Sequence, residues 1–344
     1  MIWQRLKRTW NQQTAFKLAT VYLLLLVLAM LAAPFLANNF PPNQLDLAQT
    51  YQPPGAPEHW LGTDQLGRDV WSNLLYAART AFLVALPVMS LALISGTTLG
   101  MSAAWFGNRK LEVHLAAFLS FGLWLLLVWF YVFYRFSEVP EISVFKKLAW
   151  LTGISLGVGL LHRLLKTLPF LSKKVPLPFD ELVLKTTEVL SSVPRLLLVL
   201  AFAALLSPGT GNVMLLLSLT SWIGVARLAR AETLKIKTLP YIEAAQASGL
   251  PVWRILFRQV LPNAAAPLIT AFCFGLSGLL GLEATLSFLG IGLPPETPSW
   301  GRMLAGARLN SEAWWLVLFP SLLLCCTILA IQAVGNAFRK TLNT

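Results

Sequence analysis

The chain is long enough to bury a sizeable soluble core, but it carries too little charge to cover one. It has 344 residues, of which 56% are hydrophobic and only 12% are charged, whereas soluble proteins are about a quarter charged. The formal net charge is +12, yet the basic residues lie between apolar stretches and form no basic patch interleaved with aromatic side chains. Composition therefore excludes an ordinary soluble domain, disfavours a nucleic-acid-binding protein and favours a membrane protein.

Apolar stretches of about twenty residues, the length that crosses roughly 30 Å of hydrocarbon, begin near the N-terminus. The sequence predicts eight spans, at about 17–37, 80–105, 113–134, 148–166, 186–206, 212–229, 264–289 and 313–335. His162 and Arg163 interrupt the end of the fourth. The fifth contains Pro194 and Arg195, so we expect an amphipathic start and a kink. The expected fold class is an all-α, polytopic membrane bundle.

The first span follows Arg5, Lys7 and Arg8, a pattern that also begins a secretory signal peptide. Its apolar run is longer than the signal-peptide core of about 7–15 residues, and further spans follow it. We therefore expect an uncleaved first helix, with a cleaved signal peptide as the alternative.

The distribution of lysine and arginine predicts the orientation of the spans. With the N-terminus inside, most basic residues fall on segments that this topology places inside, including residues 230–262. Residues 38–75, placed outside, hold four acidic residues against a single Arg68. Because cytoplasmic loops are enriched in Lys and Arg, both termini are expected in the cytoplasm.

Residues that carry catalysis or bind metals form no recognisable arrangement. The three cysteines lie in apolar runs, the three histidines are scattered, and neither CxxC nor Cys/His ligand spacing occurs. There is no GxxxxGKS or GxxxxGKT loop to cradle a nucleotide phosphate. We therefore expect no enzyme activity, cofactor or metal in this chain, and any energy from ATP must come from another chain.

The inner connection at about 230–262 contains a short segment with helix signals at both ends. Thr238 is a candidate N-cap, Pro240 suits the first turn, and Glu243 follows soon after. Gly249 and Pro251 form a stop signal. The pattern predicts a helix of about three turns, too polar to span a membrane.

This segment is nearly free of side-chain bulk on one face. Ala244, Ala245, Ala247 and Gly249 would let another surface approach the backbone closely, and Glu243 offers a charge for an Arg or Lys on that surface. We interpret it as a docking helix for a cytoplasmic partner. The alternative is an interfacial helix lying on lipid, which would carry Leu or Phe on one face.

The same segment resembles the EAA loop of ABC-importer permeases, in which EAA, three residues, G, nine residues and I-x-L-P follow in order. The matching residues are Glu243, Ala244, Ala245, Gly249, Leu261 and Pro262. Gln259 stands where the general pattern has Ile, although the peptide-importer branch is often polar there. The resemblance implies that this helix is the coupling helix, which seats in a groove of the ATPase subunit.

Two further stretches resemble the second, C-type permease of the dipeptide/oligopeptide/nickel family. They are His59–Val70, similar to LGTDxLGRDV, and Leu282–Gly301, similar to LEATLSFLGLGxPPPxPSWG. The resemblance covers about 15–110 and 178–340. It implies a six-helix type I importer core in a bacterial inner membrane, a homologous permease partner, two ATP-binding subunits and an extracytoplasmic substrate-binding protein. Di- or oligopeptides are the expected substrate, with nickel or another small solute as alternatives.

The first of these stretches reads as a turn followed by a helix start. Asp64 can cap the turn while pairing with Arg68 four residues on. A carboxylate in a membrane helix, as at Glu283, is a functional candidate by default. Asp64, Arg68, Asp69 and Glu283 are therefore candidates for an outer gate or a binding-protein contact, with structural scaffolding as the alternative.

The domain organisation follows from these assignments. We expect an N-terminal helix and extracytoplasmic segment at 1–79, and a permease domain at 80–340 with a coupling loop at about 230–262. An extra two-helix hairpin at about 108–178 stands where the six-helix pattern has a short turn, and we expect it to be peripheral to the pore. Gly153 with Gly157, and Gly96 with Gly100, predict close helix packing.

Ser218, Thr220 and Ser221 are candidate pore-lining residues. Two other classes of protein remain open. A secondary transporter or channel would need intramembrane charges for an ion site, and carboxylates in the middle of spans are nearly absent. A non-transporting anchor or assembly factor would not need the outer and inner motifs together.

Overall fold

The computed structural model describes residues 13–37, 40–129, 131, 144–168, 170–171 and 173–343. Their regular structure is almost entirely helical, which confirms the all-α prediction. The chain divides into two compact units. Unit 1 is drawn from Met1–Trp105 and Leu184–Thr344, and unit 2 from Phe106–Val183.

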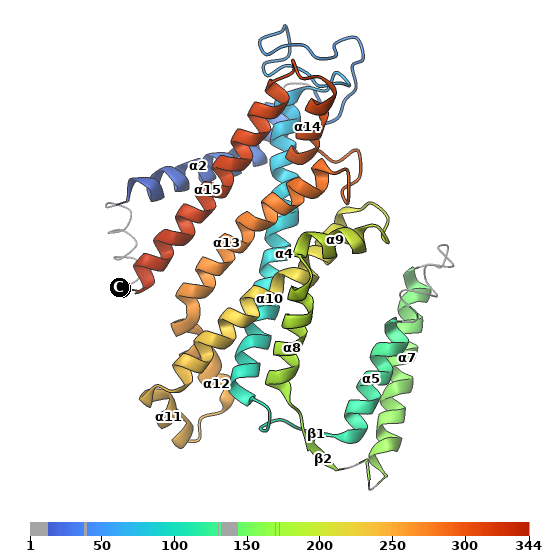
Figure 1. The fold of residues 1–344 in the computed structure, drawn as a ribbon, viewed down its shortest axis with the longest axis vertical. Helices are drawn as coiled ribbons and strands as arrows, with labels where there is room; N and C mark the ends of the chain where they lie inside the picture. The colour runs from blue at the N-terminus through green and yellow to red at the C-terminus, as the bar shows by residue number, and fades with distance from the viewer. Residues whose placement is uncertain are drawn as a thin grey trace. The chain divides into compact units, whose positions relative to one another are not determined.

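The long helices of unit 1 are separated by short connecting elements (Figure 1). In chain order they are α2 (Thr14–Leu31), α3 (Ala33–Leu36), α4 (Val70–Phe106), α8 (Phe179–Ser192), α9 (Arg195–Ala203), α10 (Thr210–Lys237), α11 (Pro240–Ala247), α12 (Val252–Ile255), the π-helical turn η2 (Leu256–Val260), α13 (Leu261–Phe288), α14 (Trp300–Gly306), the 3-10 turn η3 (Ala307–Leu309) and α15 (Trp315–Asn343). The chain passes from unit 2 into unit 1 within α8.

Five helical stretches of the described chain are long and apolar enough to cross a membrane. They are Thr14–Leu31, Val70–Phe106, Thr210–Lys237, Val252–Phe288 and Trp315–Thr341, which confirms the first, second, sixth, seventh and eighth predicted spans. The pair α8 and α9 makes a sixth if it is counted as one span, and it bends by 81°.

The bend confirms the kink predicted at Pro194. Helix α8 ends at Ser192 and α9 begins at Arg195, with Pro194 as its N-cap. A proline has no N–H to donate and disfavours helical backbone at the residue before it. The chain therefore breaks between Ser192 and Arg195.

The helices of unit 1 pack around α13, which runs beside α15 and α10, while α15 also packs on α2 (Figure 1). Helices α4 and α10 approach each other closely at two glycines. A Cβ placed on Gly96 would lie 2.7 Å from the Trp222 carbonyl oxygen, and one on Gly100 would lie 2.2 Å from the Ala226 carbonyl oxygen. The predicted packing role of this glycine pair is confirmed, because any side chain would force the two helices apart.

Helix α4 runs from one end of unit 1 to the other. Its 37 residues extend over about 55 Å. At its start, the Val70 amide donates to the Gly62 carbonyl. At its finish, the Lys237 ammonium donates to the carbonyls of Ala104 and Trp105, each at 3.0 Å. Residues 40–69 with α14 therefore lie at one end, here called the loop end, and α11 lies at the other, the α11 end (Figure 1).

Unit 2 is a helical hairpin closed at its base by two short strands. Helix α5 (Leu115–Trp129) packs on α7 (Val144–Lys166). Strand β1 (Glu112–His114) pairs antiparallel with β2 (Lys174–Pro176), so that Glu112 faces Pro176. This ribbon is a correction to the purely helical expectation, and it fixes the two chain ends of the hairpin side by side.

The described residues of unit 2 bear on two predictions made for the hairpin. Among the described residues, α7 is not one of the helices long and apolar enough to cross a membrane, whereas the predicted span at 113–134 stays a prediction, because it runs past the described part of α5. Gly153 and Gly157 are exposed, and a Cβ on either would have no atom within 4 Å, so they form no close contact with described residues. The last residues of the predicted span at 113–134 lie partly outside the described residues.

Candidate functional site

At the α11 end, α11 is a short helix held between α10 and α12. Leu239, with extended backbone, precedes it, and Pro240 occupies its first turn. Proline suits this position, since its missing N–H has no helical partner there. After Ala247 the chain turns at Gly249, whose φ is +70°, and the Leu250 amide donates to the Ala245 carbonyl at 3.3 Å. A glycine in this conformation ends a helix without steric cost.

The structure corrects two predictions about this helix. Thr238 does not cap it: its hydroxyl donates to the Lys235 carbonyl at 2.9 Å, and Thr238 closes α10 instead. Helix α11 has eight residues, which is about two turns rather than three.

The two faces of α11 differ sharply in burial. Ile242 is fully buried and Ala245 is only 7% exposed, because residues three apart share a helix face. Glu243, Ala244 and Ala247 are exposed. The prediction that Ala245 belongs to the exposed small face was therefore wrong, whereas Ala244, Ala247 and Gly249 do present little bulk to the outside.

Helix α11 is also joined to the start of α13. The Asn263 amide nitrogen donates to the Tyr241 hydroxyl at 3.1 Å and to the Gln259 carbonyl at 2.6 Å. Leu261 is half-buried and Pro262 is exposed beside them. This contact and the backbone together link α11 to the start of α13.

At the loop end, Asp64 organises the turn that precedes α4. Its Oδ2 accepts from Arg68 Nε at 2.6 Å, and its Oδ1 accepts from the amides of Leu66 and Arg68 at 2.9 and 3.0 Å. Arg68 also donates to the Asn43 side chain at 3.2 Å. The structure thus contains both the predicted cap at Asp64 and the predicted ion pair between Asp64 and Arg68.

Asp69 is buried and starts α4. Its Oδ2 accepts from the Ser72 amide at 2.8 Å, as an N-cap does. Its Oδ1 lies 2.9 Å from Nδ1 of the buried His59. The hydrogen bonds of the buried Asp69 side chain join the loop to the start of α4. These contacts favour the scaffolding alternative.

Glu283 joins α13 to α14. It is 1% exposed, and its Oε1 accepts from the hydroxyls of Ser287 and Ser299 at 2.8 and 2.9 Å. Ser299 is the N-cap of α14 and accepts from the Gly301 amide. Glu283 therefore holds the loop between the two helices, and its Oε2 has no hydrogen-bond partner among the described residues.

Arg302 fastens the same loop by hydrogen bonds to its backbone. It donates to the carbonyls of Leu293, Pro294, Pro295 and Thr297. Burial lowers the pKa of Arg302 from its ordinary value, and the nearby charge of Arg68 acts in the same direction. An arginine remains charged under such shifts, so the loop end holds two cations side by side.

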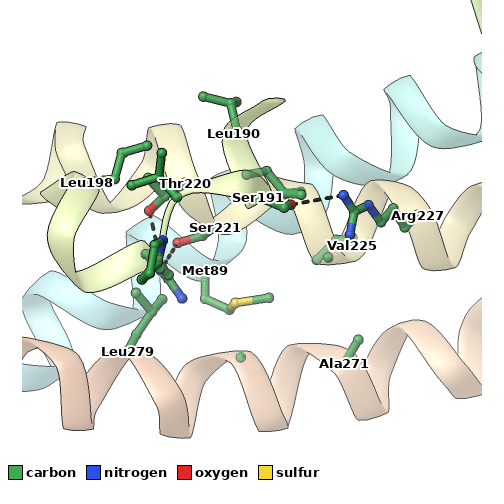
Figure 2. A pocket seen from close by; sticks show the side chains of 16 residues that line it. Met89, Leu190, Ser191, Leu198, Thr220, Ser221, Val225, Arg227, Ala271 and Leu279 are labelled. Carbon is green, nitrogen blue, oxygen red and sulfur yellow. Dashed lines mark hydrogen bonds between the residues drawn. The ribbon is translucent and has the colours of Figure 1, made fainter. Parts of the chain in front are cut away.

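Between the two ends, unit 1 contains a cavity of about 570 Å³, here called the arginine cavity. Side chains of α4, α10, α13 and the α8–α9 break surround it (Figure 2). Thr220 and Ser221, two of the three candidate pore residues, line it. Ser218 lines a separate hollow on another face of α10, with Leu215, Leu219 and Trp222.

Two arginines in this cavity were not singled out as site residues by the sequence. Arg195 donates to the hydroxyls of Thr220 and Ser221 at 3.2 and 2.7 Å. Arg227 donates to the Thr187 hydroxyl and carbonyl and to the Ser191 hydroxyl. The signal for Arg195 was its place inside a predicted span, whereas Arg227 read as one more basic residue near a span end.

Comparison with known proteins decides the family. Residues 170–343 match the model of the family described as "Binding-protein-dependent transport system inner membrane component". A relative from Brucella abortus, which carries a provisional name as a peptide transport system permease protein, is 30% identical over 330 residues and covers 96% of this chain and 87% of its own. The chain belongs to this family. It is accordingly a multi-pass permease of the inner membrane, with a transport role rather than an enzymatic one.

Other relatives in the family carry more specific names. The di/tripeptide transport system permease protein of Pseudomonas aeruginosa is 29% identical, over 94% of this chain and 86% of its own. The glutathione transport system permease protein of Pectobacterium atrosepticum is 26% identical, over 99% of this chain and 90% of its own. Both match nearly the whole permease, so the similarity is not confined to one motif.

Proposed function

We propose that this permease is the second transmembrane subunit of an ATP-driven importer of di- or oligopeptides. Peptides are supported by the names of the relatives, among them the di/tripeptide permease. Nickel or another small solute is the alternative within the same family. The observation that carries the proposal is α11, a short helix with an exposed face of small residues at one end of unit 1.

The exposed face of α11 suits a partner protein better than lipid. Ala244, Ala247 and Gly249 allow a partner's backbone to approach, and the exposed Glu243 would meet an arginine or lysine. The buried face, with Ile242 and Ala245, fixes the helix to unit 1. We assign the exposed face to contact with an ATP-binding subunit, with Leu261 and Pro262 at the junction that receives the motion.

In this proposal α11 couples ATP hydrolysis to transport. Closure of two ATP-binding subunits would move α11, and the motion would pass along α10 and, through the Asn263–Tyr241 hydrogen bond, to α13. Both helices line the arginine cavity, so their movement would open it alternately to the two sides. A homologous permease would supply the facing half of the pathway.

Orientation follows from the same assignment. The α11 end and both termini face the cytoplasm, and the loop end faces the extracytoplasmic substrate-binding protein. A membrane-impermeant thiol reagent applied from outside would therefore label a cysteine at Ala48, in the loop, but not one at Glu243. Labelling of residue 243 from outside would contradict this orientation.

The cluster of Asp64, Arg68, Asp69 and Glu283 is proposed to shape the loop end as scaffold. All their described contacts are to residues of unit 1. For Asp64→Ala we expect a lower thermal midpoint of unfolding for the purified complex, because three hydrogen bonds lose their acceptor. Lost uptake at an unchanged midpoint would instead support the gate alternative.

The assignment of α11 is tested by adding bulk to its exposed face. Ala247→Trp keeps the backbone helical but would hold a partner surface away, so the ATP-binding subunits should no longer co-purify with the permease pair. Ala48→Trp, which changes another exposed alanine but at the loop end, is the matched control and should retain them. Retention of the ATP-binding subunits by the Ala247→Trp complex would refute the assignment.

Gly249 needs a different control, because its φ of +70° disfavours most side chains whatever surrounds them. Asparagine tolerates this conformation far better than other residues. We expect Gly249→Asn to keep most of the ATP-binding subunits bound and Gly249→Trp to lose them. If both variants lost the ATP-binding subunits equally, the cause would be the presence of any side chain at position 249 rather than its size.

A further inference from the structure

The arginine cavity brings together two cations with no anion among its described lining residues. No aspartate or glutamate is among the residues that surround it. Among the described residues, Arg195 and Arg227 donate hydrogen bonds only to hydroxyls and to one backbone carbonyl. Both arginines are exposed within this chain, and a charged residue in a membrane span is a functional candidate by default. The cavity therefore holds two cations for which its described lining supplies no counter-charge.

The hydrogen bonds leave part of each guanidinium available. Arg195 donates through Nε and Nη2, and so does Arg227. In both side chains Nη1, with its two N–H groups, has no acceptor among the described residues. The hydroxyls of Thr220 and Ser221 therefore orient Arg195, and that of Ser191 orients Arg227 (Figure 2), while both side chains keep donors for a further group.

The backbone at the start of α9 adds partial positive charge to that of the two arginines. The first turn of α9 begins at Pro194 and Arg195, both of which line the cavity. The earliest described amide of this helix with an internal acceptor is that of Leu198, which donates to the Pro194 carbonyl. The free N–H groups of a first turn carry partial positive charge, so the helix start favours an anion over a cation.

The size and walls of the cavity suit a small solute. Its volume of about 570 Å³ lies within the range of roughly 300–1,000 Å³ typical of ligand sites. Ser221 and Arg227 are six residues apart on α10, about 9 Å along the helix axis. Met89, Leu198 and Leu279 supply apolar walls around this polar strip.

We propose that the arginine cavity is a transit site for the carboxylate of the transported peptide, with Arg195 and Arg227 as its anion-binding residues. A planar guanidinium binds a carboxylate through paired N–H donors. The absence of an acidic residue from the described lining means that the peptide's ammonium group finds no counter-charge there. The proposal rests on the proposed import function, and it deepens it by naming the chemical group that the pathway recognises.

The charge of the cavity can be measured without transport. The permease is purified as its complete complex in detergent, with Cys273, Cys325 and Cys326 replaced by alanine and Gly224→Cys introduced. Gly224 lines the cavity, and a Cβ there has open space. The rate of thiol modification is then compared for an anionic and a cationic methanethiosulfonate of similar size.

We expect the anionic reagent to react about tenfold faster or more, since a cleft of one charge sign raises local counter-ion concentration by that order. Combining Arg195→Gln with Arg227→Gln should abolish the preference, while the two Arg→Lys changes should preserve it. Ser218→Cys, on the other hollow of α10, is the matched control and should show no such preference. An unchanged rate ratio in the double Gln variant would overturn the proposal.

Peptide protection completes the test. Trialanine at millimolar concentration should slow modification of Gly224→Cys by an uncharged methanethiosulfonate, and trialanine with an amidated C-terminus should not. Equal protection by both would overturn the carboxylate assignment. These rates do not require ATP-driven uptake, so a failure of the import function would appear separately, as a transporter without uptake but with an intact charge preference.

Discussion

At the scale of single residues, unit 1 depends on positions where no side chain fits. The backbones of α4 and α10 meet at Gly96 and Gly100, and a Cβ on Gly100 would lie 2.2 Å from the Ala226 carbonyl oxygen. Such a contact cannot be relieved by rotating a side chain, because the opposing atom belongs to the backbone. Close approach therefore requires glycine at both positions.

We predict that Gly100→Ala lowers the free energy of unfolding by about 1–3 kcal/mol, the usual cost of overpacking. Gly153→Ala is the matched control: it also adds one methyl group to a helix, but into open space. There the change should be neutral or stabilising by up to about 1 kcal/mol, because alanine favours helix. Thermal midpoints of the two purified variants would measure the difference, and equal midpoints would contradict the close crossing.

Single residues also mark where sequence reasoning succeeds. The pairing of Asp64 with Arg68 and the kink at Pro194 depend on neighbours within a few positions, so the local pattern was enough. The burial of Ala245 depends on what α11 packs against. The bonds from Arg227 to Thr187 join residues 40 positions apart, and no local pattern reports them.

At the scale of elements, unit 2 ends in a ribbon that brings its entry and exit together. Glu112 faces Pro176 across the antiparallel pair, which places their Cα atoms about 5 Å apart. The separation of β1 and β2 in the sequence, with two helices between them, explains why the ribbon was not predicted. It also makes the hairpin removable with little strain on the remaining chain.

We predict that deleting residues 113–175, with one glycine joining Glu112 to Pro176, leaves an assembled transporter that retains most of its uptake. A single residue spans such a gap comfortably, since consecutive Cα atoms lie about 3.8 Å apart. Assembly is checked by co-purification of the partner subunits, and uptake by accumulation of a labelled dipeptide. Lost uptake in an intact complex would show that the hairpin takes part in transport.

At the scale of the whole molecule, unit 1 arranges three features along α4. The loop end and α11 lie at opposite ends of α4 (Figure 1). The loop end holds the ion pair and the buried carboxylates, and the arginine cavity lies between the two ends. A solute that passed from the loop end to the α11 end would cross the cavity. The sequence predicted the two ends through their motifs, but the cavity arises only when four helices are packed together.

The central claim is that motion of α11, driven by ATP hydrolysis in partner subunits, powers import through this permease. Its most direct test is uptake of a labelled dipeptide by proteoliposomes that contain the complete transporter, binding protein and ATP. We predict uptake that requires hydrolysable ATP and is lost with Ala247→Trp. Uptake that continued without any nucleotide hydrolysis, or that was indifferent to Ala247→Trp, would contradict the account.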